Sequence, residues 1–444
     1  MRKLQITGGQ QLHGTLKISG AKNTLLPIMT ACLMVQGTVR LHHVPRIDDL
    51  SKMLHILAGL GCRINMQGDT VKIDVQQPLT HVINHTAAKK IRGSIFVMGA
   101  LLARMGKVQL PFPGGCSIGS RPIDIHLDLL QQIGVKYQIT PTEIIATYTP
   151  KKYRGVKVLT MDFASVGATE NIIQATALGL EGNTYQIVGA AKEPEIVDLC
   201  NFLNQCGANI TGAGTDVITV RSVSKLHGTD YTPIPDRIIT GSYLIAAAVT
   251  GGDITLQNAD PTHNVNLINK LRLAGAKITT TADSIRLVMR RRRCYHFHLH
   301  TAAYPGFPTD LQSQFCVLMA LIRGDSDITE NLYENRFRYV SELNKLGAKI
   351  KVTGSQAQIH GVKQFDATPT ANLCPSAYGT PEPDECRGTT LIAADLRGGV
   401  ALVIAALAAK GTTTILNADY IYRGHQDIVN DLQQLGANIV ALSD

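Results

Sequence analysis

The sequence predicts an α/β protein of two domains, each built from three copies of one unit of about 72 residues. Two observations support this class. A helix-ending glycine followed by an alternating strand recurs six times, and a second glycine precedes another strand at a nearly constant distance upstream. Because the unit mixes helix with strand and is too long for a solenoid repeat, each copy should be a small module whose sheet faces a common core.

The first recurring element is the end of an amphipathic helix. Leucines at i and i+3 or i+4 precede a glycine suited to the left-handed C′ position, and alternating apolar residues then predict a strand. The six copies are ILAGLGCRI (56–64), LLQQIGVKY (129–137), FLNQCGANI (202–210), LRLAGAKI (271–278), ELNKLGAKI (342–350) and DLQQLGANI (431–439).

The second recurring element is a glycine turn that leads into a strand. It occurs in QGTVRL, MGKVQL, EGNTYQI, GGDITL, RGDSDI and KGTTTI, 23 to 28 residues before the helix-ending glycine. Successive helix-ending glycines are separated by 73, 73, 68, 72 and 89 residues, so the last interval carries an insertion. We place it at residues 364–390, where four prolines and few aliphatic residues predict a surface loop.

The composition excludes several classes of protein. The longest uncharged apolar stretch, residues 23–39, is interrupted by Pro27, Gly37 and polar residues, so no membrane-spanning helix is expected. The start of the sequence shows no secretory signal, which predicts a cytoplasmic location. The nine cysteines are scattered and form no C-x-x-C pair. Five of them sit in apolar periodic segments and are expected to be buried thiols; they are Cys32, Cys62, Cys200, Cys206 and Cys316. The formal charge of +9 suits an anionic partner, either nucleic acid or a small substrate with phosphates and carboxylates.

One stretch indicates chemistry by its own residue pattern. In FPGGCSIGSRPIDIH (112–126), Cys116 follows two glycines, and Arg121 lies five residues later. On this spacing Cys116 is either a plain turn residue or a thiol that a flexible backbone carries to a reaction.

Ten ordered blocks then show a resemblance that covers nearly the entire chain. The blocks are SGAKNTLLP (19–27), IRGS (91–94), PGGCSIGSRPIDIH (113–126), SVGATE (165–170), EPEIVDL (193–199), PDRIITGSYL (235–244), FPTDLQSQF (307–315), ENRF (334–337), ADLRGG (394–399) and YRGH (422–425). Through them the sequence resembles the enolpyruvyl transferases.

The resemblance implies a fold of two inside-out α/β barrels with an interdomain cleft that closes on substrate. Each barrel would hold three β-α-β-α-β-β units, six repeats in all, with the first strand in the second domain. The expected domains are residues 22–235, which carry the Cys116 lid loop, and residues 1–21 plus 236–444, which carry the insertion.

The implied reaction moves the enolpyruvyl group of phosphoenolpyruvate to the 3′-hydroxyl of UDP-N-acetylglucosamine and releases phosphate, the first committed step of peptidoglycan synthesis. It implies these two small-molecule substrates, no metal or organic cofactor, and no nucleic acid or membrane partner. The oligomeric state stays open.

The resemblance assigns catalytic roles to a thiol, a lysine and two carboxylates. Cys116 matches the acid that protonates the methylene carbon, on a lid where Arg121 would favour the thiolate. Lys22 matches a contact to phosphoenolpyruvate, although alone it reads as a lysine beside an apolar helix. Asp310 matches the base at the 3′-hydroxyl, with a helix start as its alternative, and Asp395 matches a carboxylate of proton handling.

Further matches concern substrate binding. Asn23, Arg92 and Leu332 match contacts to the sugar nucleotide or to both substrates. Three arginines match the anion-binding set of the family, although each alone is typical of a solvated surface; they are Arg336, Arg397 and Arg423. Two segments match nucleotide contacts, the second through amides of a turn before a helix; they are Arg121, Pro122, Ile123, Asp124 and Ile125, and Phe163, Ala164, Ser165, Val166 and Gly167.

Several features depart from the family pattern or lie outside it. Phe163 stands where a lysine is expected and Ile239 where relatives carry glutamate, so acceptor contacts could differ. The arginine run 290–293 is expected to end a hairpin before an alternating strand, with nucleic-acid binding as the alternative. Three histidines on that strand are expected to form an exposed polar face, with metal binding as the alternative; they are His296, His298 and His300.

Two further functions remain open from the sequence. A paralogue could use the same donor with another acceptor, such as shikimate 3-phosphate, although the cysteine loop and RPIDI disfavour it. A non-catalytic relative could bind sugar nucleotides, although it would have no need for both the thiol and the full set of cations.

Overall fold

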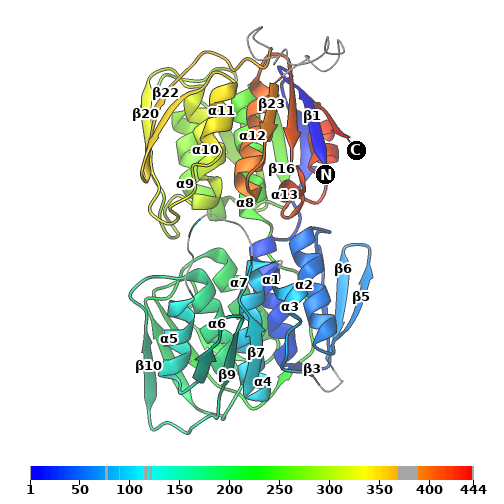
Figure 1. Ribbon diagram of the computed structural model, residues 1–444, viewed down its shortest axis with the longest axis vertical. Coiled ribbons are helices and arrows are strands. Elements are labelled where there is room, and N and C mark those ends of the chain that lie inside the picture. Colours follow the sequence, from blue (N-terminus) through cyan, green and yellow to red (C-terminus); the bar gives the residue numbers. More distant parts are fainter. Residues whose placement is uncertain are drawn as a thin grey trace.

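The computed structural model describes residues 2–75, 79–89, 91–114, 119, 123–368 and 389–442. These residues form two lobes, one above the other in Figure 1, and each lobe has its own hydrophobic core. The core of the first lobe is drawn from residues 25–231, and that of the second from residues 4–18 and 238–439. Both lobes mix helices with strands, so the predicted α/β class is confirmed.

The six helix-ending glycines have the predicted backbone. All have positive φ, between 86° and 112°, a region that glycine adopts without the strain of a Cβ. Each separates a helix from a strand; the pairs are α2 (Asp48–Gly59) and β5 (Arg63–Gln67), α5 (Asp124–Gln132) and β8 (Lys136–Ile139), α7 (Pro194–Gln205) and β12 (Asn209–Thr211), α9 (Val265–Leu273) and β17 (Lys277–Thr280), α11 (Val340–Lys345) and β21 (Lys349–Thr353), and α14 (Ile428–Gln434) and β25 (Asn438–Leu442).

In the first lobe, strand pairing follows one order. An outer strand runs parallel to its neighbour, and the remaining strands run antiparallel. The sheets are β15 (Asp230–Tyr231)–β4 (Thr38–Leu41)–β6 (Thr70–Asp74)–β5, β10 (Val156–Thr160)–β11 (Thr184–Val188)–β13 (Val217–Arg221)–β12, and β7 (Lys107–Pro111)–β9 (Glu143–Thr147)–β8. In the last sheet, a parallel bridge from Val82 to Gln109 of β7 takes the place of the outer strand.

The second lobe repeats this pairing order in three further sheets. They are β2 (His13–Lys17)–β16 (Asp253–Gln257)–β18 (Ser284–Val288)–β17, β19 (His298–His300)–β20 (Asp325–Thr329)–β22 (Gln356–His360)–β21, and β23 (Thr389–Ile392)–β24 (Thr412–Leu416)–β1 (Lys3–Thr7)–β25. The N-terminal strand β1 thus lies between strands from the end of the chain, in the second lobe.

Three helices in each lobe are buried on nearly all sides. They are α1 (Lys22–Ala31), α4 (Val97–Met105) and α6 (Val166–Ala177) in the first lobe, and α8 (Arg237–Thr250), α10 (Thr309–Ala320) and α12 (Leu396–Ala408) in the second. We call these six the inner helices. Helix α12, for example, packs on α8, α10, β1 and β24. A helix that is apolar on nearly all sides is stable only inside protein, and in α1, α10 and α12 the charged side chains stand in the first turn.

The segment after β18 is mostly not a strand. The alternation of residues 294–300 predicted one, but only His298–His300 pair as β19. The arginine run before it has a structural contact instead, because Arg292 donates to the carbonyls of Val249 and Leu321 at 2.7 and 3.2 Å. These carbonyls lie at the C-terminal ends of α8 and α10, where an arginine satisfies otherwise unpaired acceptors.

None of the described helices is both long and apolar enough to span a membrane.

The lobes are joined by two chain crossings that pair with each other. Gly20 and Pro235 form an antiparallel bridge between them. Next to this bridge, Asp236 caps α8 by accepting two amides of its first turn, both at 2.9 Å. The same carboxylate accepts the amide of Lys22 at 3.1 Å. One side chain therefore orders the starts of an inner helix in each lobe.

Replacing Asp236 tests this role. Asp236→Ala is expected to lower the free energy of unfolding by about 2 kcal/mol, because it removes a helix cap and leaves buried amides unpaired. Asp236→Asn keeps a capping oxygen and should lose roughly half as much. Urea denaturation of both variants beside the wild type measures the difference, and equal stability of all three proteins would contradict the shared cap.

Candidate functional site

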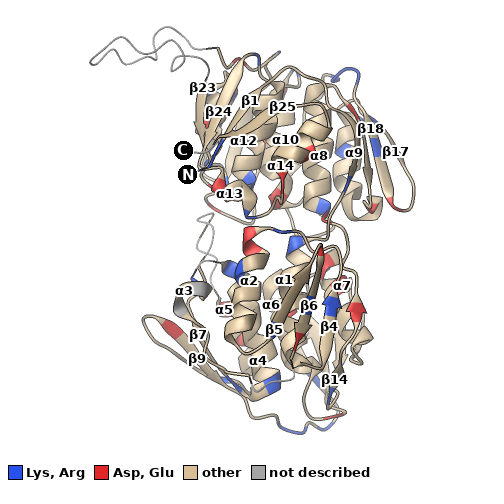
Figure 2. Ribbon diagram, turned by 90° about the vertical axis from the view of Figure 1, so that its right-hand side faces the viewer, with Lys and Arg blue, Asp and Glu red and all other residues tan. Residues whose placement is uncertain are grey.

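The N-terminal ends of several inner helices meet at the junction of the lobes. Lys22 begins α1, Asp310 lies in the first turn of α10 and Arg397 in that of α12. In Figure 2, charged segments at the upper ends of α1, α2 and α7 face the base of the second lobe. Because helix N-termini carry partial positive charge and unpaired N–H groups, this junction favours anions.

Lys22 and Arg423 share one carboxylate across the junction. Asp49, in the first turn of α2, accepts Arg423 Nε at 3.0 Å and Lys22 Nζ at 3.4 Å. Arg423 follows α13 (Asp419–Tyr422) in the second lobe, whereas the other two belong to the first. Burial lowers the pKa of Lys22, and Asp49 opposes this effect. The alternative from the sequence was a lysine beside an apolar helix with its ammonium group in solvent. This alternative is wrong, because the side chain of Lys22 is only 12% exposed.

Asp310 is held by two arginines. Its Oδ2 accepts Arg397 Nη2 at 2.7 Å and Nε at 3.1 Å, and its Oδ1 accepts Arg336 Nη2 at 2.8 Å. Burial disfavours ionisation of this carboxyl, but Arg397 and Arg336 outweigh it and hold the pKa of Asp310 well below its usual range. Asp310 does lie at a helix start, but its oxygens bind guanidinium groups and make no helix cap.

Asp395 is the N-cap of α12. Its Oδ1 accepts the amides of Arg397 and Gly398 at 2.9 and 3.0 Å, and the residue is 1% exposed. The cap fixes the start of the helix and therefore the point from which the Arg397 side chain reaches Asp310. Asp395 acts on the site through this cap in the described state.

Four cations from both lobes gather around these carboxylates. We call them the cation cluster: Lys22, Arg336, Arg397 and Arg423. The cluster exceeds the negative charge of Asp49, Asp310 and Asp395, and the helix N-termini add to its field. Preorganised cations of this kind stabilise charge that develops or departs during a reaction. The arrangement is suited to a small anion with more than one negative group.

His425 belongs to this site although sequence reasoning did not single it out. It is 3% exposed, its ring meets the Tyr243 ring edge-on at 6.1 Å, and its Nε2 has no partner among the described atoms. Burial, reinforced by Arg397 and Lys22, lowers the pKa of His425 to about 3. The imidazole is therefore neutral beside the cations. Its place two residues after Arg423 is the signal that could have found it.

The segments expected to bind the nucleotide lie together in the first lobe. Ile123, Asp124 and Ile125 lead into and begin α5, and the second segment leads into α6; its members are Phe163, Ala164, Ser165, Val166 and Gly167. A Cβ on Gly167 would stand 3.1 Å from the imidazole of His126, so the first turns of α5 and α6 touch. Ser165 caps α6 by accepting an amide at 3.3 Å.

Asn171 fixes these neighbouring helix starts from inside the lobe. Its Nδ2 is 2.9 Å from His126 Nδ1 and donates to the Ile95 carbonyl at 3.1 Å, while its Oδ1 accepts the Gly99 amide at 2.8 Å. It thereby links α6 to α5 and α4. Sequence reasoning missed this residue, and the signal was an asparagine inside the apolar run NIIQATA.

Three predicted residues lie outside the described part of the chain: Cys116, Arg121 and Pro122. Gly119, between them, is described, and a Cβ on it would overlap the carboxylate of Glu334 in the second lobe. Gly119 therefore lies against the second lobe, at a residue two positions before Arg336 of the cation cluster.

The remaining predicted contacts are placed on separate elements. Asn23 follows Lys22 in α1 and is half-buried. Arg92 begins the 3₁₀ helix η2 (Arg92–Phe96) of the first lobe. Leu332 lies between β20 and Arg336, with its amide donating to Glu330 at 3.0 Å.

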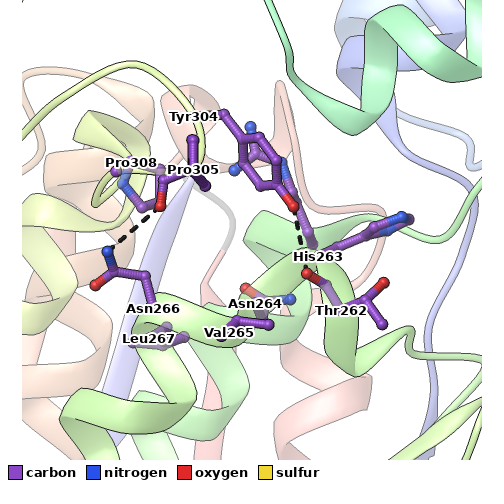
Figure 3. A pocket seen from close by; sticks show the side chains of 11 residues that line it. Thr262, His263, Asn264, Val265, Asn266, Leu267, Tyr304, Pro305 and Pro308 are labelled. Carbon is purple, nitrogen blue, oxygen red and sulfur yellow. Dashed lines mark hydrogen bonds between the residues drawn. The ribbon is translucent and has the colours of Figure 1, made fainter. Parts of the chain in front are cut away.

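A small pocket beside the junction is not this site (Figure 3). Tyr304 donates to the Thr262 carbonyl at 3.3 Å on its wall, and none of the predicted site residues lines it. Arg237 is part of that wall and pairs with Glu195 of the first lobe at 2.9 Å.

In the described residues, no group of three or more His, Cys, Asp or Glu side chains could hold a metal ion.

Comparison with known proteins identifies the family. A family model described as EPSP synthase (3-phosphoshikimate 1-carboxyvinyltransferase) matches residues 6–432. The chain belongs to the enolpyruvyl transferase family. UDP-N-acetylglucosamine 1-carboxyvinyltransferase 2 of Caldanaerobacter subterraneus is 42% identical over 446 residues, covering 100% of both chains. A UDP-N-acetylglucosamine 1-carboxyvinyltransferase of Nostoc is 41% identical over 444 residues, covering 99% of this chain and 94% of that protein.

Solved enolpyruvyl transferases share the fold. The enolpyruvyl transferase NikO from Streptomyces tendae aligns with a TM-score of 0.84 at 23% identity, covering 99% of both chains. EPSP synthase from Acinetobacter baumannii aligns with a TM-score of 0.72 at 17% identity over the full length of both.

The two departures from the family pattern occupy different environments. Phe163 is 52% exposed just before α6, so an aromatic face stands open at the start of that helix. Ile239 is 8% exposed in the first turn of α8 and belongs to the core of the second lobe.

The buried imidazole predicts a pH dependence of stability. Below about pH 6.5 the unfolded chain protonates His425, whereas the folded chain does so only near pH 3, so protons favour unfolding. Relative to His425→Phe, the wild type should lose about 1.4 kcal/mol of unfolding free energy per pH unit below about 6. Urea denaturation at several pH values measures this slope. Parallel slopes for wild type and His425→Phe would contradict the burial argument.

Proposed function

We propose that this chain transfers the enolpyruvyl group of phosphoenolpyruvate to the 3′-hydroxyl of UDP-N-acetylglucosamine and releases phosphate. The cation cluster at the lobe junction carries this proposal, in a chain that is 42% identical over its full length to a UDP-N-acetylglucosamine 1-carboxyvinyltransferase. The reaction is the first committed step of peptidoglycan synthesis, and we place it in the cytoplasm. It needs no metal or organic cofactor.

The cation cluster fits the chemistry of the donor. Phosphoenolpyruvate carries a phosphate that must leave and a planar carboxylate that must stay. A compact ammonium such as that of Lys22 suits the first, and arginine forks such as those of Arg397 and Arg336 suit the second. Arg423 adds a cation from the second lobe beside Lys22.

Asp310 is proposed as the base for the acceptor hydroxyl. In the described state its ion pairs keep it a weak base, because both oxygens are engaged by arginines. An anionic donor that attracts Arg397 and Arg336 would loosen these pairs and raise the pKa of Asp310 toward its usual range. Asp310 would then accept the 3′-hydroxyl proton only with the donor in place.

Cys116 is proposed as the acid that protonates the methylene carbon of the donor. The contact of Gly119 with Glu334 supports a loop that reaches the second lobe near the arginines. Asp395 remains a candidate for proton handling through its second oxygen, since the first is used by the cap.

The nucleotide is proposed to bind at the starts of α5 and α6. The amides after Ser165 can meet the diphosphate, as helix N-termini do, and the segment that includes Asp124 can meet the uracil. The remaining proposed contacts to the sugar nucleotide are Asn23, Arg92 and Leu332.

We also infer the finer architecture. The common strand order of the sheets and the six helix-ending glycines support two inside-out α/β barrels of three β-α-β-α-β-β units each. The separate cores support domains at residues 22–235 and at 1–21 plus 236–444, with the substrate cleft between them. The insertion at 364–390 stays a prediction, because residues 369–388 lie outside the described part of the chain.

A coupled phosphate-release assay tests the reaction. Purified protein should release phosphate only when phosphoenolpyruvate and UDP-N-acetylglucosamine are both present. Release with shikimate 3-phosphate in place of the sugar nucleotide would assign another acceptor, and binding of UDP-N-acetylglucosamine without any release would assign a non-catalytic role. Asp310→Asn is the matched inactive control, because it removes the proposed base and keeps the shape of the side chain.

Replacing the proposed acid gives a second test. Cys116→Ser should keep the fold and substrate binding but lose turnover by roughly 10²- to 10⁴-fold, the usual worth of general acid–base catalysis. An epoxide analogue of phosphoenolpyruvate should alkylate the wild type and not the variant, as read by peptide mass spectrometry. Cys294 is an exposed internal competitor, and alkylation there instead of at Cys116 would contradict the assignment.

A further inference from the structure

One carboxylate joins the lobes beside the proposed donor site. Asp49 Oδ1 accepts Arg423 Nε at 3.0 Å, and Oδ2 lies 3.4 Å from both Lys22 Nζ and Arg423 Nη2. Three residues after Arg423, the side-chain oxygen of Gln426 accepts the Arg46 amide at 2.8 Å. The segment that begins α2 therefore meets the segment after α13 through two neighbouring polar contacts.

The position of Asp49 is not explained by the needs of its helix. An acidic residue in the first turn of α2 is favourable, but Asp48 already provides one and is more exposed. Asp49 is 4% exposed, and a carboxylate buried to that extent is costly unless cations and hydrogen bonds compensate it. Both of its oxygens face Lys22 and Arg423, so the compensation comes from the proposed donor site.

We propose that Asp49 is a positioning residue of the transfer reaction, which holds Lys22 of one lobe and Arg423 of the other at a spacing that receives the phosphate of the donor. Two cations that converge from different lobes repel each other. One carboxylate between them offsets half of their charge, so the pair stays together and still attracts an anion. This inference rests on the proposed function.

The charged groups around Lys22 predict how its pKa changes when Asp49 is replaced. Burial lowers the pKa of Lys22, Arg397 and Arg423 act in the same direction, and Asp49 and Asp310 oppose them. Asp49 itself also faces Lys52, and the neutral His425 lies within electrostatic reach of Lys22. Without Asp49, only Asp310 would still favour the protonated amine. Lys22 should then lose its proton at a lower pH than in the wild type.

The kinetic test uses Asp49→Asn, which keeps the size of the side chain. We expect kcat/KM for phosphoenolpyruvate to fall at least tenfold, KM for UDP-N-acetylglucosamine to change less than twofold, and the alkaline limb of the pH profile for the donor to move to lower pH. Asp49→Glu should restore part of the activity and return the limb. Asp253→Asn, which breaks a comparable but exposed pair with Arg286, should change none of these quantities.

A second readout does not depend on turnover. Competitive acylation followed by peptide mass spectrometry measures the pH at which Lys22 becomes reactive, and this pH should be lower in Asp49→Asn than in the wild type. An unmoved Lys22 titration overturns the proposal even if the variant is less active, because the loss is then structural. If the wild type releases no phosphate but the Lys22 titration still shifts in Asp49→Asn, the proposed function is contradicted. The coupling of Asp49 to Lys22 is then established all the same.

Discussion

The structure depends on holding like charges together at the junction of two lobes. Lys22, Arg336, Arg397 and Arg423 are all largely buried there, and buried cations are tolerated only beside carboxylates. Asp49 and Asp310 serve as these partners, each bound to two cations. Each of these two carboxylates offsets only one of the two positive charges that it binds, so the two pairs still attract an anion.

The inner helices explain why the charges collect at this place. Their sides are mostly apolar, so the charged groups of α1, α10 and α12 stand at the ends of these helices, and several of these ends meet where the lobes meet. Asp236 and Asp395 cap two of these helices and fix their starts. The packing of the cores therefore sets the positions of Lys22 and Arg397 more firmly than a surface loop could.

The arrangement also links the electrostatics of the site to the placement of the lobes. The pair of Asp49 with Arg423 and the pair of Glu195 with Arg237 both cross the junction, in addition to the paired crossings at Gly20 and Pro235. An anion that enters the cation cluster changes the balance of charges that now joins the lobes. Binding and lobe placement are coupled in this way because the same side chains serve both.

The sequence by itself determined the local and repeating features. Helix-ending glycines with positive φ, strands after them and buried cysteines follow from short-range pattern, because glycine alone adopts that backbone freely and apolar periodicity selects a buried face. The resemblance of ten blocks added the family and the candidate site residues. The same local reasoning failed at residues 294–300, since a strand also needs a partner along its whole length.

Only the tertiary structure decided which charges compensate one another. Asp49 interacts with Lys22, and His425 interacts with Arg397 and Lys22, although no sequence pattern singled out Asp49 or His425. The pKa of each of these two groups depends on burial and on a neighbour from the other lobe. The same holds for Asp310, whose two arginines are 26 and 87 residues away along the chain. Electrostatic interactions act through space and are set by local burial, so residue order alone could name Asp310 and its arginines but could not pair them.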